Sequence, residues 1–302
     1  MAARKTTPMR QSAVTGRGVN EVVRKGSWHL FGLMIFTFFA GASEGRADPL
    51  ARPSINDAEW RYDITPYIFL PSSATGDSTI AGQTVSFDLD TSDLLDLLDF
   101  AISARFEAWK GDYGLILDLN YIKLGKSGTV RGPGPLPLNA DITVDIRQLF
   151  FDTMGSYRVV KAPYNAAGDL WTFEVMGGIR TNYLEQVVDV GLSGGLVPAG
   201  TEVELGGDKT WVDPMFGIRV GASLNERWSA GFRADVGGFG ITDTDLTWSV
   251  TGAFDYRPWE TTSLKFGYRY YSIDYASTLS DGAFAYDIVE HGPYVAATFS
   301  FQ

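Results

Sequence analysis

The sequence contains no cysteine and only two histidines among its 302 residues. Without cysteine the chain forms no disulfide and offers neither a thiolate nucleophile nor a cysteine metal site. In the region after residue 47 the one histidine is His291, and no serine lies within two positions of it. A Ser–His nucleophile pair and a usual zinc site are therefore both unsupported. We expect no enzyme activity, and the sequence indicates no cofactor.

Basic side chains are also few, with 25 Lys and Arg against 36 Asp and Glu and a formal net charge of −11. Phosphates repel such a chain, so nucleic acid is not an expected partner. Long apolar runs are missing too. Beyond the N-terminal segment no stretch approaches the roughly 20 apolar residues that a spanning helix needs.

The N-terminal segment has the pattern of a targeting signal. Several Lys and Arg residues precede a short apolar stretch from Trp28 to Ala42, and Gly45 and Ala47 supply small residues for a cleavage site. The sequence predicts a cleaved signal peptide over residues 1–47 and one domain over residues 48–302. An uncleaved N-terminal anchor is the alternative.

Two-residue alternation is the dominant pattern of residues 48–302. From Trp171 to Arg180, one set of alternate residues is mostly apolar or aromatic, whereas the other includes Glu174 and Arg180. Because successive side chains of a strand point to opposite faces, each such segment is apolar on one face and polar on the other. The pattern recurs about ten times. An apolar, aromatic face opposite a charged face is what a transmembrane β-barrel requires, with lipid outside and a polar lumen inside.

The final segment strengthens this interpretation. Val295, Ala297, Phe299 and Phe301 share one face, and here the chain resembles outer-membrane β-barrel proteins of Gram-negative bacteria, although Gln302 follows the last aromatic residue. The segments Trp60–Tyr67 and Asp93–Asp96 also resemble an uncharacterised, porin-like or OmpA-like group of such barrels. The resemblance implies location in the cell outer membrane and contact with its lipid. It implies no activity and no oligomeric state.

We therefore predict an all-β fold with a single antiparallel barrel, short periplasmic turns and long extracellular loops. About ten strands are expected, and twelve are possible if Gln83–Leu89 is also a strand. A bulge near Arg147 would explain a change of apolar parity in its strand. The ten expected strands lie near 60–70, 100–110, 113–124, 141–158, 170–184, 209–223, 227–238, 245–257, 262–275 and 285–301.

Alternation also divides the side chains between the two faces of the wall. Tryptophan and tyrosine beside the short turns predict an aromatic girdle at the membrane interface. The expected girdle is Trp60, Trp109, Tyr113, Trp171, Trp228 and Trp259, with Trp211 and Trp248 in the opposite girdle. The expected lumen residues, to which Asp145 is added, are Arg61, Asp63, Arg105, Glu107, Asp118, Arg147, Glu174, Arg180, Asp213, Arg219, Arg233, Asp235, Lys265, Arg269 and Glu290.

The densest acidic cluster lies in the first long loop and consists of Asp88, Asp90, Asp93, Asp96 and Asp99. Interleaved leucines give the segment from Thr91 to Asp99 helical spacing, so we expect a short amphipathic helix at the barrel mouth, capped by Thr91 or Ser92. An EF-hand loop that starts at Asp88 is excluded, because Asp93 stands where the loop needs glycine and Asp99 stands where it needs glutamate. An irregular Ca²⁺ site, or a divalent cation bridging to lipid phosphate, is the functional alternative.

Three hypotheses follow from these patterns. The first is an outer-membrane barrel that acts as an envelope scaffold or as a narrow passive channel for small solutes. The balanced charges of the lumen favour ion pairs that fill a narrow interior. The second is a surface binding or adhesion barrel that uses its acidic extracellular loops. The third, an outer-membrane hydrolase, depends on His291. A soluble, secreted all-β protein is the remaining alternative.

Overall fold

The computed structural model describes residues 59–131, 139–194, 197–198 and 200–302. The predicted signal peptide lies outside the described residues, as does the start of the predicted barrel domain. Within the described part of the chain, none of the helices is long and apolar enough to cross a membrane.

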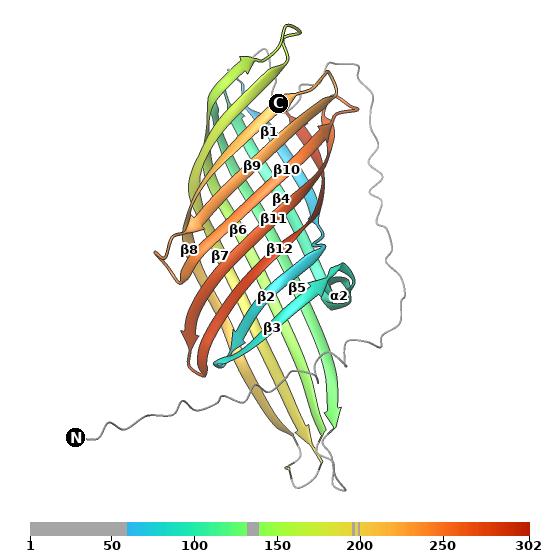
Figure 1. The fold of residues 1–302 in the computed structure, drawn as a ribbon, viewed down its shortest axis with the longest axis vertical. Coiled ribbons are helices and arrows are strands. Elements are labelled where there is room, and N and C mark those ends of the chain that lie inside the picture. Colours follow the sequence, from blue (N-terminus) through green and yellow to red (C-terminus); the bar gives the residue numbers. More distant parts are fainter. Residues whose placement is uncertain (1–58, 132–138, 195–196, 199) are drawn as a thin grey trace, which may run out of the picture. The chain divides into compact units, whose positions relative to one another are not determined.

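Twelve antiparallel strands form one sheet, and ten of them close into a ring (Figure 1). Around the ring the order is β1, β4, β5 and so on to β12, which pairs back with β1. The ring strands are β1 (Arg61–Phe69), β4 (Leu98–Lys110), β5 (Tyr113–Arg131), β6 (Asn139–Pro163), β7 (Leu170–Ser193), β8 (Thr201–Ser223), β9 (Trp228–Gly238), β10 (Thr244–Tyr256), β11 (Thr262–Leu279) and β12 (Gly282–Phe301). The predicted antiparallel barrel is thus confirmed.

Side chains along the barrel strands alternate between the outer surface and the interior, as the sequence pattern requires. Along β1, Ile64 and Ile68 are exposed on the outer surface while Thr65 and Tyr67 are buried inside. Aromatic and aliphatic side chains cover the outer face of the other strands in the same way, including Phe216, Phe254 and Phe266. Closure of the ring leaves no unpaired strand edge where β1 and β12 meet, which is the condition for strands to cross a bilayer.

The first long loop is largely structured. It holds the hairpin of β2 (Ser73–Ile80) and β3 (Gln83–Asp90), followed by the helix α2 (Thr91–Leu97). β2 pairs with Ala285–His291 of β12, beyond the part of β12 that pairs with β1. The strand expected as a possibility at Gln83–Leu89 is present, so the sheet has twelve strands although the ring has ten. The short helix predicted over Thr91–Asp99 is present as α2.

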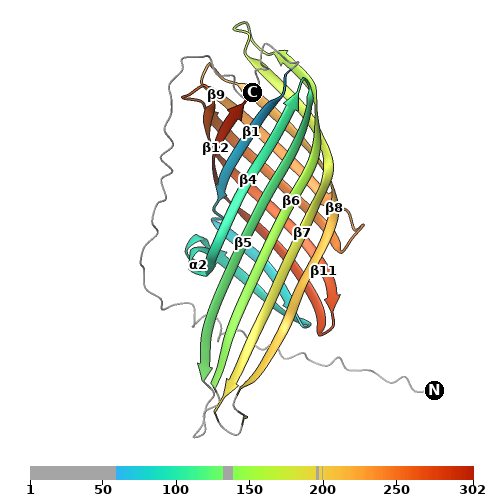
Figure 2. The ribbon, with the colours of Figure 1, turned by 180° about the vertical axis from the view of Figure 1, so that it is seen from behind.

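The strands β5 to β8 run far past their neighbours on the side opposite the short turns (Figure 2). β6 has 25 residues and β7 has 24, whereas β9 has 11. Much of the chain expected as loops at 125–140 and 185–208 therefore continues the strands. In β6 the alternation continues through this end in the reverse sense, with Ile142 and Val144 on the inner parity and Asp141 and Thr143 on the outer one.

Candidate functional site: the barrel lumen

An ionic layer crosses the lumen near the short turns. Arg219 on β8 reaches Glu107 on β4 with Nη1–Oε1 at 2.9 Å, and its Nε lies 2.6 Å from Oε2 of Glu174 on β7. Arg158 on β6 pairs with the same Glu174 at 3.3 Å. Since β4 and β8 are not neighbours in the ring, the Arg219–Glu107 pair spans the interior from wall to wall. All four side chains are largely buried.

Trp109 completes this layer and corrects one prediction. It was expected in the outer girdle, but it is 3% exposed and its Nε1 donates to Glu107 at 2.9 Å. The guanidinium carbons of Arg158 and Arg219 lie 4.8 Å and 5.3 Å from its ring. Trp109 therefore joins the lumen as the partner of two cations. Gly114 leaves the space, since a Cβ there would lie 2.7 Å from the indole.

A second ionic layer lies further along the strands. Arg180 on β7 makes a two-pronged contact with Asp152 on β6, with Nε–Oδ1 at 2.6 Å and Nη2–Oδ2 at 2.9 Å, and Nη2 also lies 3.5 Å from Asp235 on β9. Arg233 on β9 lies 3.1 Å from Asp235 and 3.6 Å from Asp118 on β5. This layer therefore also connects strands that are not adjacent in the ring.

Asp118 ties this layer to the opposite wall. It accepts from Arg105 Nη2 at 2.6 Å and from the hydroxyl of Tyr67 at 2.8 Å. Apolar side chains lie between the two ionic layers along the strands, namely Ile116, Met154, Met176 and Met215. Buried charges without partners are costly, so this dense pairing is what a narrow polar interior requires.

An aromatic cluster fills the outer part of the barrel. Trp211 stacks on Tyr275 with ring centroids 3.8 Å apart, and Phe150 packs on Tyr271 at 5.2 Å. Leu94 of α2 and Ala74 of β2 belong to the same buried cluster. The hydroxyl of Ser78 on β2 hydrogen-bonds to Gln186 on β7. The loop that holds β2, β3 and α2 therefore packs against the inner side chains of the outer barrel.

The other predicted lumen residues also lie on the inner face. Arg61 pairs with Asp63 at 3.2 Å, and Lys265 lies 3.7 Å from Asp255. The guanidinium carbon of Arg269 lies 5.5 Å from the ring centre of Phe69 and 5.4 Å from that of Tyr271. Asp213 is fully buried and accepts from neutral donors, and Glu290 is partly buried on β12. The donors to Asp213 are Asn182, Trp211, Thr242 and Thr244.

Arg147 was placed in the lumen by the sequence pattern, and this is wrong. Its side chain is 41% exposed on the outer wall and pairs with Glu185 at 3.0 Å. The same holds for Asp145, whose partner at 3.8 Å is Lys123. The β5–β6 register runs unbroken through Arg147, so the bulge expected there is absent, and the irregularity in β6 falls at Arg158 and Val160 instead. Phe150 and Ile146 of β6 keep the inner parity throughout.

The outer charges form a row across four strands. Lys123, Arg147, Glu185 and Asp208 are successive cross-strand partners on β5, β6, β7 and β8. Charged residues on the outer wall are incompatible with the middle of a lipid band. We infer that this row marks the level at which the wall leaves the membrane.

At the other end of the wall lies the predicted girdle. Trp60, Tyr113, Trp228 and Trp259 are exposed beside the short turns, and Trp171 shares the outer parity of Val175. Trp211, expected in the opposite girdle, is instead buried in the aromatic cluster. The parity of β8 explains this difference, since Trp211 shares a face with Asp213.

The acidic cluster of the first loop has a structural role. Asp90, rather than Thr91 or Ser92, caps α2, and Asp93 completes a capping box with it. The hydroxyl of Ser92, followed by the backbone amide of Asp93, lowers the pKa of Asp90 below its ordinary value of 3.8. Asp99 pairs with Lys123 at 2.8 Å. Among the described residues, no group of three or more carboxylates and histidines is arranged to hold a metal ion.

Sequence reasoning missed three charged lumen residues. Asp152, Arg158 and Asp255 are all buried on the inner face. A signal was present for two of them: in β6 the outer face carries Phe151 and Tyr157, which places their neighbours Asp152 and Arg158 inside.

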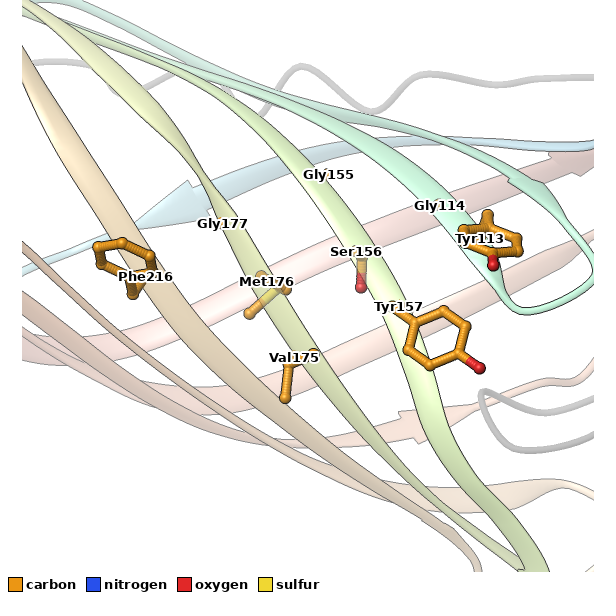
Figure 3. A pocket seen from close by; sticks show the side chains of 9 residues that line it. All are labelled: Tyr113, Gly114, Gly155, Ser156, Tyr157, Val175, Met176, Gly177 and Phe216. Atoms are coloured by element: carbon orange, nitrogen blue, oxygen red, sulfur yellow. The ribbon is translucent and has the colours of Figure 1, made fainter.

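A groove of about 500 Å³ lies on the outer wall near the short turns (Figure 3). Its floor is formed by Gly155 and Gly177, which are direct cross-strand partners on β6 and β7. Aromatic side chains stand around it, with the rings of Tyr113 and Tyr157 5.1 Å apart at one end and Phe216 at the other.

No protein-family model and no curated protein matches the chain. Solved outer-membrane barrels are similar in fold. Ail, the attachment invasion locus protein of Yersinia pestis, solved with the heparin analogue sucrose octasulfate, matches at 10% identity over 80% of this chain and 99% of Ail, with a TM-score of 0.33. The translocator domain of the autotransporter NalP from Neisseria meningitidis matches at 12% identity over 80% and 88%, with a TM-score of 0.37. The toluene transporter TodX of Pseudomonas putida matches at 9% identity over 80% and 90%, with a TM-score of 0.26. At these identities the likeness concerns the fold alone.

Proposed function

We propose that this protein is an outer-membrane barrel with a closed lumen, which serves as a membrane-embedded envelope scaffold. The observation that carries the proposal is the set of ion pairs that cross the lumen. Arg219–Glu107 connects β8 with β4, and Arg233–Asp118 connects β9 with β5. A ten-stranded barrel is only a little wider than the eight-stranded kind that side chains fill, so such pairs leave little room for solute.

The outer wall supports the membrane location. Tyr113 of the girdle and Lys123 of the charged row lie on the same strand, β5. At about 3.3 Å per residue and a tilt of about 40°, the ten residue steps from Tyr113 to Lys123 span about 25 Å along the barrel axis. This is the height of the apolar band of outer-membrane barrels. The side chains between these levels that face outward include Leu115, Leu117 and Tyr121.

The test is conductance in a planar bilayer. We expect the refolded protein, checked for heat-modifiable gel mobility, to insert without discrete conductance steps, because the ionic layers and the aromatic cluster block the lumen. Stable steps whose size changes when Arg219 or Arg233 is substituted would instead establish a narrow channel. A chain that stays in solution without detergent would contradict the membrane location itself.

The projecting sheet favours a second candidate function, binding at the cell surface. Beyond the charged row, β5 to β8 carry exposed carboxylates that include Asp141, Asp189, Glu202 and Glu204. Rigid strands that project from a closed barrel present a fixed acidic surface, which suits a basic partner.

Binding to a polylysine-coated surface tests this candidate. We expect the barrel in detergent to bind at low salt and to dissociate as salt rises above about 0.15 M, where exposed charges are screened within about 8 Å. Replacing Glu202 and Glu204 with glutamine should weaken binding. The matched control is the pair Asp169→Asn and Glu226→Gln in the short turns at the opposite end of the barrel, which removes the same number of charges. Equal loss in both variants would show that net charge, and not the projecting sheet, is responsible.

A further inference from the structure

The groove on the outer wall has a floor that the fold does not require. A Cβ added at Gly155 would have its nearest neighbour at 3.8 Å, and one added at Gly177 would also meet its first atom at 3.8 Å. Both are ordinary contacts, so alanine would fit at either position. By contrast, a Cβ at Gly178 or Gly217 would collide with backbone atoms at 2.0 Å and 2.9 Å.

Glycine weakens a strand interior, where β-branched and aromatic residues are favoured. The strand register is continuous at Gly155 and Gly177, so no bulge explains them. Their backbone does not adopt a left-handed conformation either. One physical reason for glycine in a strand is the close approach of a ligand or of another chain to the backbone, and here two such glycines lie side by side as cross-strand partners between apolar side chains.

The walls of the groove are apolar, and its turn end is polar. Leu115 and Phe216 flank the glycine pair as their cross-strand partners, and Val175 lies beside them with 40% of its surface exposed. At the turn end stand Tyr113 and Tyr157. Lys110, exposed on the outer face, is the direct cross-strand partner of Tyr113. Two hydroxyls thus lie at the interface end of an apolar groove, and Lys110, whose Nζ lies 5.8 Å from the centre of the Trp60 ring, supplies a cation on the neighbouring strand rather than in the groove itself.

This arrangement matches an amphiphile with an anionic head. We propose that the groove holds one acyl chain of a phospholipid, which lies over Gly155 and Gly177 while its phosphate lies near Lys110 and Tyr113. The inference rests on the proposed membrane location, since the groove then lies within the lipid band at the girdle end. Tyrosine at this level keeps its ring in lipid and its hydroxyl in the head-group region.

Native mass spectrometry of the detergent-solubilised protein, after incubation with palmitoyl-oleoyl phosphatidylglycerol, tests the proposal. We expect the wild-type protein to retain one phospholipid under conditions that strip looser lipid. The double variant Gly155→Val and Gly177→Val fills the groove and should lower the occupancy about tenfold or more. Lys110→Ala should weaken retention to a smaller degree.

The matched control is Gly252→Val on β10. Gly252 also faces outward with no atom within 4 Å of its would-be Cβ, but it lies on another part of the wall. The Gly252→Val variant should therefore retain the phospholipid as the wild-type protein does. If the double variant fails to show heat-modifiable mobility, Gly177→Ala supplies the smaller change, since its methyl group meets nothing closer than 3.8 Å.

Three results would overturn the proposal. Equal retention by the wild type and the double variant would show that the groove does not hold the lipid. A dimer mass that is lost only in the double variant would assign the groove to a second copy of the chain. A wild-type barrel that inserts into bilayers but retains no phospholipid would reject the groove as a lipid site while leaving the proposed scaffold function intact.

Discussion

Replacing Arg180 with methionine should lower the free energy of unfolding by about 3–5 kcal/mol, the range for breaking a buried ion pair by removing one partner. Arg180 is 2% exposed and contacts both Asp152 and Asp235. Without the guanidinium of Arg180 the two buried carboxylates repel each other, and among the cations that the structure describes only Arg233 remains within 4 Å of both of them. Urea unfolding of the barrel in lipid vesicles, followed by tryptophan fluorescence, measures the change.

Arg147→Met is the matched control for this experiment. Arg147 also pairs with a glutamate, but its side chain is 41% exposed on the outer wall. Exposed pairs contribute roughly 0–1 kcal/mol, so this variant should remain close to the wild type. Similar losses in the two variants would contradict the assignment of Arg180 to a buried lumen network and of Arg147 to the exterior.

Replacing Trp211 with alanine should destabilise the barrel by about 3–5 kcal/mol, as large-to-small changes of buried aromatic residues do. The indole stacks on Tyr275, and its Nε1 donates to Asp213 at 3.0 Å and lies 2.6 Å from the hydroxyl oxygen of Thr244. The substitution leaves a cavity in the aromatic cluster and removes one donor from a fully buried carboxylate. We also expect near-ultraviolet circular dichroism from the Trp211–Tyr275 stack to disappear.

Trp259→Ala is the control, because Trp259 lies in a short turn and is 52% exposed. The loss of stability should be clearly smaller there, and the near-ultraviolet spectrum should keep the features of the stacked pair. A loss at Trp211 no greater than that at Trp259 would mean that the aromatic cluster does not hold the outer barrel together.

The sequence predicts the ring of the barrel well where lipid lies on one side and charge on the other. In β7, Val175 and Ile179 face outward while Glu174 and Arg180 face inward, as their alternation indicates. The prediction weakens where this contrast ends. Beyond Lys123 the outer face turns polar, and in β6 the apolar residues Ile142, Val144 and Ile146 share the inner parity of Phe150, so the alternation reverses its sense without any bulge.

Two misplaced residues show the same limit for the site. Arg147 lies where the wall leaves the membrane, and at that level a charge on the outer face is no longer costly. Parity alone could have placed it, since it shares a face with Phe151. Trp109 was assigned to the girdle because it precedes a turn, yet it shares the parity of Arg105 and Glu107. In both cases alternation along the strand was a better guide than residue type.

The same edge of β12 pairs with two different strands. Its C-terminal half pairs with β1, and its N-terminal half pairs with β2. These contacts join residues far apart in the chain, as in the Thr65–Thr298 hydrogen bond, which spans 233 positions. Hairpins of consecutive strands such as β4–β5 can form locally. The pairings of β12 with β1 and with β2 instead bring the two ends of the barrel sequence together. Such pairings form slowly, because the entropy of the long intervening chain is lost before the contacts are made. We therefore expect closure of the ring and docking of the β2–β3 hairpin both to be late steps of assembly, because each of them waits for β12.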